Sequence, residues 1–146
     1  MTRIDFYTGV DDKARLAHSI AGKVLARDQH LVIALADEAA LTALDKALWT
    51  LAATSFVPHC RADDALAGRT PILLTCADDP PPNGDQVLLN LRPDPPAFFS
   101  RFDRLLEFVG TDSDDIERSR QRFRFYRDRG YEITTHKLDE RGAQSQ

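Results

Sequence analysis

The chain has 146 residues, of which 42% are hydrophobic and 29% are charged, and its formal net charge is -4. This length is typical of one domain that buries a core without disulfides or metal, and the composition excludes an intrinsically disordered chain. No apolar run approaches the roughly 18 residues that a membrane span needs, and the opening MTRIDFYTG lacks the plan of a signal peptide. We therefore expect a cytoplasmic protein without membrane contact. Its acidity argues against a protein that coats DNA with its whole surface.

Short apolar runs alternate with helical stretches along the chain. Strands are predicted at residues 4–7, 30–35, 71–76, 86–91 and 105–109. Helices are predicted at residues 13–27 and 38–49, with a short one at 95–102 and a long final one that starts at Asp112 or Ser113. Asp11 or Asp12 can cap the first helix and Asp37 the second.

This alternation predicts an α/β fold: a single Rossmann-like domain over residues 1–138, in which helices flank a mostly parallel sheet. Residues 139–146 are interpreted as a frayed tail. The turn after the first strand, residues 8–12, has one glycine and two carboxylates, and it matches neither GxGxxG nor a P-loop. We therefore expect no nucleotide-binding loop, and a nucleotide-dependent enzyme is the weakest hypothesis.

The histidines and cysteines form no recognisable catalytic or metal-binding motif. The histidines (His18, His30, His59 and His136) lack paired-ligand spacing, and Cys60 and Cys76 stand sixteen positions apart. We expect free, mostly buried thiols. Neighbours on an extended chain point opposite ways, so His59 and Cys60 are interpreted as a loop histidine beside a packed thiol. No catalytic residue, metal or cofactor is expected, and a binding function ranks above an enzyme.

A first candidate binding surface surrounds the single tryptophan of the chain. Trp49 ends the second predicted helix, and Phe56 follows in a loop of small residues before Pro58. Such aromatic residues either close the edge of the core or anchor a partner. Because large aromatic side chains are usually buried, the residues alone favour a role in the core.

A second candidate surface is the final helix, where six arginines lie between Arg118 and Arg129. A helical projection places Ile116, Phe123 and Tyr126 on the core-facing side. The arginines divide into a row of Arg120, Arg124 and Arg127 and an opposite flank of Arg118, Arg122, Phe125 and Arg129. They either pair locally with Asp114, Asp115, Glu117 and Asp128 or bind an anionic partner. Guanidinium groups beside an apolar notch favour a short acidic peptide with an apolar terminus, or nucleic-acid phosphate.

The chain resembles a known family in several motifs that occur in a fixed order. The most specific are LDxxLW (44–49) followed by SFxPH (55–59), and RxRFxFYRxRGY (120–131). Further matching pieces are residues 5–7, 36–38, 87–91 and 98–102. In these motifs, and over nearly its whole length, the chain resembles the chi subunit of bacterial DNA polymerase III.

The resemblance implies a Rossmann-like fold without a nucleotide or a catalytic activity. It implies an accessory subunit of the clamp loader, which binds the psi subunit on one side and the acidic C-terminal tail of single-stranded-DNA-binding protein on another. By position, the expected tail-binding residues are Val109, Arg120, Phe123, Arg124 and Thr135. Trp49 and Phe56 fall at the expected psi-subunit interface, which reverses the preference for a role in the core. Direct nucleic-acid binding through the arginine helix, including a weak DNA contact beside the adaptor role, remains the alternative.

Overall fold

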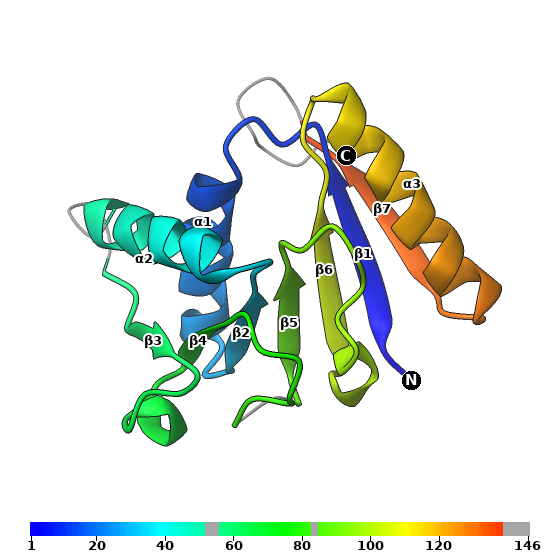
Figure 1. Ribbon diagram of the computed structural model, residues 1–146. Helices are drawn as coiled ribbons and strands as arrows, with labels where there is room; N and C mark the ends of the chain where they lie inside the picture. The colour runs from blue at the N-terminus through cyan, green and yellow to red at the C-terminus, as the bar shows by residue number, and fades with distance from the viewer. Residues whose placement is uncertain (52–55, 83–84, 139–146) are drawn as a thin grey trace.

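The computed structural model describes residues 1–51, 56–82 and 85–138, and it has the predicted α/β architecture (Figure 1). The described strands are β1 (Arg3–Thr8), β2 (Leu31–Ala34), β3 (His59–Arg61), β4 (Ile72–Thr75), β5 (Val87–Asn90), β6 (Arg104–Phe108) and β7 (Ile133–Lys137). Their order across the sheet is β3-β4-β2-β5-β6-β1-β7, and every pairing among them is parallel. No helix in these ranges is long and apolar enough to cross a membrane. The expected tail, 139–146, lies outside the described residues.

Helices cover both faces of the sheet. They are α1 (Lys13–Ala26), α2 (Glu38–Leu51) and α3 (Ser113–Asp128), and each begins after an aspartate, as expected. The side chains of Asp12, Asp37 and Asp112 accept hydrogen bonds from backbone N–H groups of the first turn of α1, α2 and α3 respectively. Such caps satisfy amide groups that have no partner inside the helix.

The apolar core forms two layers, one on each face of the sheet. Ile33 and Leu89 belong to the layer beneath α1 and α2, whereas Val32 and Leu88 belong to the layer that includes Tyr126 of α3. Successive residues of a strand point to opposite faces, so a strand covered on both sides is apolar throughout. This explains why β2, β4 and β5 are buried along their whole length.

Two of the strands, β3 and β7, were not predicted from the sequence, and both lie at edges of the sheet. β3 has only three residues, and β7 is mostly polar and half-exposed, so neither has the apolar run by which the central strands were predicted. The sequence predicts a start but no end for the final helix. It ends at Asp128, and Gly130 then takes a φ of 82°, which allows the chain to turn back into β7 beside β1.

Three smaller predictions need correction. The short helix expected at 95–102 is a single turn of 3₁₀ helix, Phe99–Arg101. The thiols of Cys60 and Cys76 are free, as expected, but both are half-buried rather than mostly buried. His59 is not a loop residue, because it starts β3 and is buried.

The carboxyl ends of β2 and β5 mark the point where the chain changes direction across the sheet. After β2 the chain continues toward β3, and after β5 it continues toward β6. Ligands of α/β proteins commonly bind at such a point. Here Arg92 occupies it, because its Nε donates to the carbonyl of Leu35 at 3.0 Å and its Nη2 to that of Ala77 at 2.6 Å.

Candidate functional site

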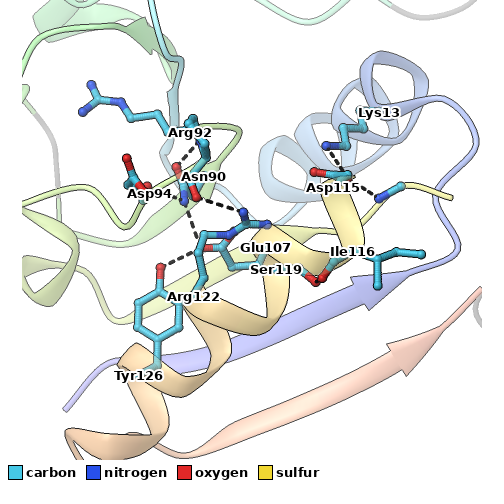
Figure 2. Close-up of polar contacts among 12 residues, drawn as sticks. Lys13, Asn90, Arg92, Asp94, Glu107, Asp115, Ile116, Ser119, Arg122 and Tyr126 are labelled. Carbon is cyan, nitrogen blue, oxygen red and sulfur yellow. Dashed lines mark hydrogen bonds and ion pairs between the residues drawn. The ribbon is translucent and has the colours of Figure 1, made fainter. Parts of the chain in front are cut away.

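The N-terminal end of α3 is fixed by contacts of Asp115. Its Oδ2 accepts a hydrogen bond from the Gly110 N–H at 2.6 Å and forms an ion pair with Nζ of Lys13 at 2.9 Å. Partial burial alone would raise the pKa of Asp115, but the Gly110 N–H and the Lys13 ammonium together hold that pKa below its usual value. These contacts tie α3 to both α1 and the end of β6 (Figure 2).

The middle of α3 is anchored to the sheet by a buried polar network around Glu107. Nε of Arg122 lies 2.9 Å from Oε1 of Glu107, while the Tyr126 hydroxyl and the Asn90 amide donate to Oε2 at 2.6 and 2.9 Å (Figure 2). Glu107 is 0% and Arg122 3% exposed. Burial raises the pKa of Glu107, against the opposing effect of Arg122 and the two donors, and burial also raises the pKa of Tyr126.

This network corrects the assignment of Arg122 to a solvent-facing flank. The centre of the buried stripe is Ser119, Arg122 and Tyr126, while Ile116 and Phe123 are half-buried at its margin. Two signals in the sequence could have revealed this. Arg122 lies three residues after Ser119 and four before Tyr126, and Glu107 is the single charge inside the apolar run LLEFV.

The other arginines of α3 are exposed, and some pair locally. Nη1 of Arg120 lies 3.4 Å from Oε2 of Glu117, and Nη2 of Arg127 lies 3.1 Å from Oδ1 of Asp128. Asp115 forms its ion pair with Lys13 and not with an arginine of α3. The guanidinium of Arg129 stacks 3.5 Å from the centre of the Phe125 ring. Within the described ranges, Arg118 and Arg124 form no ion pair. Exposed pairs contribute little to stability, so these guanidinium groups remain available to an anionic partner.

The expected tail-binding residues lie where α3 passes over β1 and β7. The Phe123 ring packs edge-on against Phe6 with centroids 5.5 Å apart, and Thr135 is the register partner of Phe6 on β7. Val109 is buried in the same apolar layer as Phe6. Arg120 and Arg124 are exposed one turn apart on the helix, on either side of Phe123 in the sequence. We call these five residues (Val109, Arg120, Phe123, Arg124 and Thr135) the α3–β7 surface, although Val109 is buried beneath it; Figure 1 shows the helix lying along the strand.

The expected psi-subunit residues form an exposed aromatic pair. Trp49 is 54% and Phe56 52% exposed, and their ring centroids are 5.4 Å apart. A role in the core, which the residues alone favoured, is therefore wrong. Trp49 also packs on the buried His59 ring at 5.0 Å, and Nε2 of that ring lies 3.1 Å from Oδ1 of Asp45. His59 thus supports the base of the aromatic pair.

Within the described residues, no group of three or more histidine, cysteine, aspartate or glutamate side chains could hold a metal ion. The fold and its surfaces define a class: a single-domain α/β protein with an arginine-rich helix on one face and an exposed aromatic pair at the end of α2.

Comparison with known proteins identifies the family within that class. The family model for the "DNA polymerase III chi subunit, HolC" matches residues 1–134. Proteins named "DNA polymerase III subunit chi" are similar over nearly the whole chain. The one from Pseudomonas aeruginosa is 34% identical over 142 residues, which cover 94% of this chain and 98% of that protein. The one from Escherichia coli is 28% identical over 134 residues, which cover 92% and 89%. The chain therefore belongs to the DNA polymerase III chi subunit family, and the resemblance inferred from its motifs is confirmed.

Proposed function

We propose that this chain is a non-catalytic replication adaptor, which links the clamp loader, through a psi subunit, to the acidic C-terminal tail of single-stranded-DNA-binding protein. The observation that carries the proposal is the α3–β7 surface of a chain in the chi family, where basic and apolar side chains meet. The proposal needs two separate binding surfaces. The helical residues of the α3–β7 surface lie on α3, whereas Trp49 of the aromatic pair lies on α2.

The α3–β7 surface has the chemistry that an acidic tail ending in phenylalanine requires. Arg120 and Arg124 would bind carboxylates, because a guanidinium group donates two parallel hydrogen bonds to a carboxylate. Phe123 and Val109 would contact the terminal ring, and Phe123 already takes part in an edge-on aromatic contact with Phe6. The Thr135 hydroxyl on β7 would supply a further hydrogen bond.

The expected affinity for the tail is in the micromolar range. A few exposed charge contacts and one buried ring yield about 5–8 kcal/mol after the cost of immobilising a peptide. Salt should weaken the complex, because the contacting charges are exposed to solvent.

The aromatic pair supports the psi-subunit half of the proposal. Exposed Trp and Phe side chains in contact with each other are uncommon on a surface without a partner, and aromatic residues dominate the binding energy of many interfaces. The buried His59 ring beneath Trp49 holds that side chain in place before a partner arrives.

The test of tail binding is a titration with a fluorescent acidic peptide ending in Pro-Phe, at low and high salt. The double variant Arg120→Ala, Arg124→Ala should weaken binding at least tenfold, and so should removal of the terminal Phe from the peptide. Arg118→Ala is the matched control, since it removes one exposed charge from the other flank of α3. Failure of the intact peptide to bind would refute this half of the proposal.

The test of the psi interface is co-purification with the psi subunit from the same genome. Trp49→Ala and Phe56→Ala should each reduce the recovered complex, whereas Leu66→Ala, which changes another exposed apolar side chain, should not. A complex that survives both aromatic substitutions would place the interface elsewhere.

Direct nucleic-acid binding is the alternative, and one observation favours it: Arg118 and Arg124 of α3 are exposed and form no ion pair with any residue that the structure describes, in a chain with a formal net charge of -4. It predicts tight binding of single-stranded oligonucleotides, without another protein, and a steep salt dependence. That result, together with no binding of the acidic peptide, would replace the adaptor by a nucleic-acid-binding module.

A further inference from the structure

A small pocket opens on the flank of α3 that faces away from the α3–β7 surface. Its volume is about 170 Å³, and it lies at the carboxyl ends of β5 and β6, beside the N-terminal half of α3. Residues of α1, of β5 and the segment after it, of β6 and of α3 line it, among them Lys13, Asn90, Phe108, Arg118 and Arg122. We call it the α3 pocket; Figure 2 shows two of its lining residues, Lys13 of α1 directed toward Asp115 and Arg122 of α3 directed toward Glu107.

The most informative group in the α3 pocket is the Arg122 guanidinium. Its Nε is paired with Glu107, and its Nη1 donates to the Pro93 carbonyl at 3.1 Å. Its Nη2 has no hydrogen-bond partner among the described residues. A cation that is 97% buried, has one nitrogen without a partner and lines a pocket provides a donor for an anion.

Further donors come from the rim of the pocket. Arg118 is exposed and has no ion pair within the described part of the chain. Lys13 is partly exposed, and its ammonium contacts Asp115 at 2.9 Å. Arg92 adds few free donors and little net charge, because its guanidinium donates to the carbonyls of Leu35 and Ala77 and forms an ion pair with Asp78 at 3.2 Å.

The charges of the pocket favour an anion. The cations that line it are Lys13, Arg92, Arg118 and Arg122, and Asp115 is the one carboxylate among its described lining residues. Asp115 accepts hydrogen bonds from Gly110 and Lys13, and Glu107, which is not among the lining residues, is paired with Arg122. The pocket is therefore locally positive in a chain whose formal net charge is -4.

We propose that the α3 pocket binds a phosphate group. Donors that approach from α1, from the rim of α3 and from the buried Arg122 suit a tetrahedral oxyanion with several acceptor oxygens better than a planar carboxylate. The pocket is too small for a whole nucleotide, so the rest of a larger ligand would project into solvent. The carboxyl ends of parallel strands are also where α/β folds commonly bind ligands. The phosphate is either free or part of a nucleic-acid backbone.

The test is a titration of the full chain with inorganic phosphate and pyrophosphate at constant ionic strength, followed by the amide NMR signals of residues 110–118. We expect saturable shifts, weakened at least fivefold by Arg118→Ala and by Lys13→Ala. Asp115→Asn removes the carboxylate and should strengthen binding. Arg127→Ala is the matched control, because it removes an exposed α3 arginine from outside the pocket and should leave affinity unchanged. Absence of saturation, or an equal loss with Arg127→Ala, would overturn the proposal.

The same titration with a short single-stranded oligonucleotide distinguishes the two sources of phosphate. A nucleic-acid source predicts tighter binding of the oligonucleotide than of phosphate, with both weakened by Arg118→Ala. If the pocket binds free phosphate, Arg118→Ala should weaken the binding of phosphate and pyrophosphate but not the binding of the oligonucleotide.

The pocket does not depend on the adaptor role. The double variant Arg120→Ala, Arg124→Ala should abolish binding of the acidic peptide and leave phosphate binding intact. The peptide titration therefore tests the adaptor proposal, and the phosphate titration tests the pocket proposal independently of it.

Discussion

Arg122 and Glu107 form a salt bridge between α3 and β6 in which both side chains are almost fully buried, with Nε and Oε1 2.9 Å apart. A charge removed from water in this way costs free energy unless its partner and hydrogen bonds compensate for it. Here the side chains of Asn90 and Tyr126 also donate hydrogen bonds to the Glu107 carboxylate. The pair fixes the position of the helix that carries both the α3–β7 surface and the α3 pocket.

Replacement of Arg122 by leucine should strongly destabilise the fold. The substitution leaves the Glu107 carboxylate buried without its countercharge, which costs about 3–5 kcal/mol of unfolding free energy. The measurement is urea unfolding followed by circular dichroism. Arg118→Leu, one turn earlier on the exposed side of α3, should change the unfolding free energy by less than about 0.5 kcal/mol. Equal effects of the two substitutions would contradict the structural role of the pair.

Gly130 and Gly22 should respond oppositely to alanine. Gly130 has a φ of 82°, and a Cβ there meets no atom within 4 Å, so Gly130→Ala adds backbone strain alone and should destabilise by about 1 kcal/mol. Gly22 lies inside α1, also with open space around it, so Gly22→Ala should stabilise by about 0.5–1 kcal/mol. Thermal unfolding of both variants measures the difference. A stabilising effect at Gly130 would show that the turn between α3 and β7 tolerates another conformation.

The central strands could be predicted from the sequence because they are buried on both faces. Such strands are continuous apolar runs, as at 31–35 and 72–74, and their direction follows from the intervening helices. The edge strand β7 could not be predicted in this way, because its residues, ITTHK, are half-exposed and mostly polar. The position of β7 follows from the structure alone. The chain turns at Gly130 after the end of α3, and β7 then pairs with the edge of β1.

The roles of the site residues were harder to predict than the strands. Residues of the same type, such as the arginines of α3, differ in whether they are buried, and the residue type alone does not show which are. Nothing in the chemistry of Arg122 separates it from the other arginines of α3; only its place between Ser119 and Tyr126 does. Trp49 illustrates the converse. Tryptophan side chains are usually buried, which favours burial of Trp49 as well. Trp49 follows Leu48, a buried residue of α2, by one position, so its side chain is rotated by about 100° toward solvent.

Acid should remove a contribution of Asp115 to stability. The pKa of Asp115 is held below its usual value of 3.8 in the folded state, so the unfolded chain binds a proton more readily as the pH falls. The stabilisation is complete above the unfolded pKa and is lost as the pH falls through the folded one. Unfolding free energies between pH 7 and pH 3 should therefore fall more steeply for the natural chain than for Asp115→Asn. Asp114→Asn, whose side chain lacks the Lys13 contact, should keep the steep profile; parallel profiles for the natural chain and Asp115→Asn would contradict the assignment.

Trp49→Ala should leave the fold nearly as stable as before, because about half of the side chain is already exposed. The loss of its contacts with Phe56 and His59 should cost less than about 1 kcal/mol of unfolding free energy. Leu48→Ala, one residue earlier and fully buried, should cost about 2–5 kcal/mol. Chemical unfolding of the two variants compares neighbouring positions on one helix. If Trp49→Ala proved as damaging as Leu48→Ala, the aromatic pair would belong to the core, and its use as a partner surface would lose its physical basis.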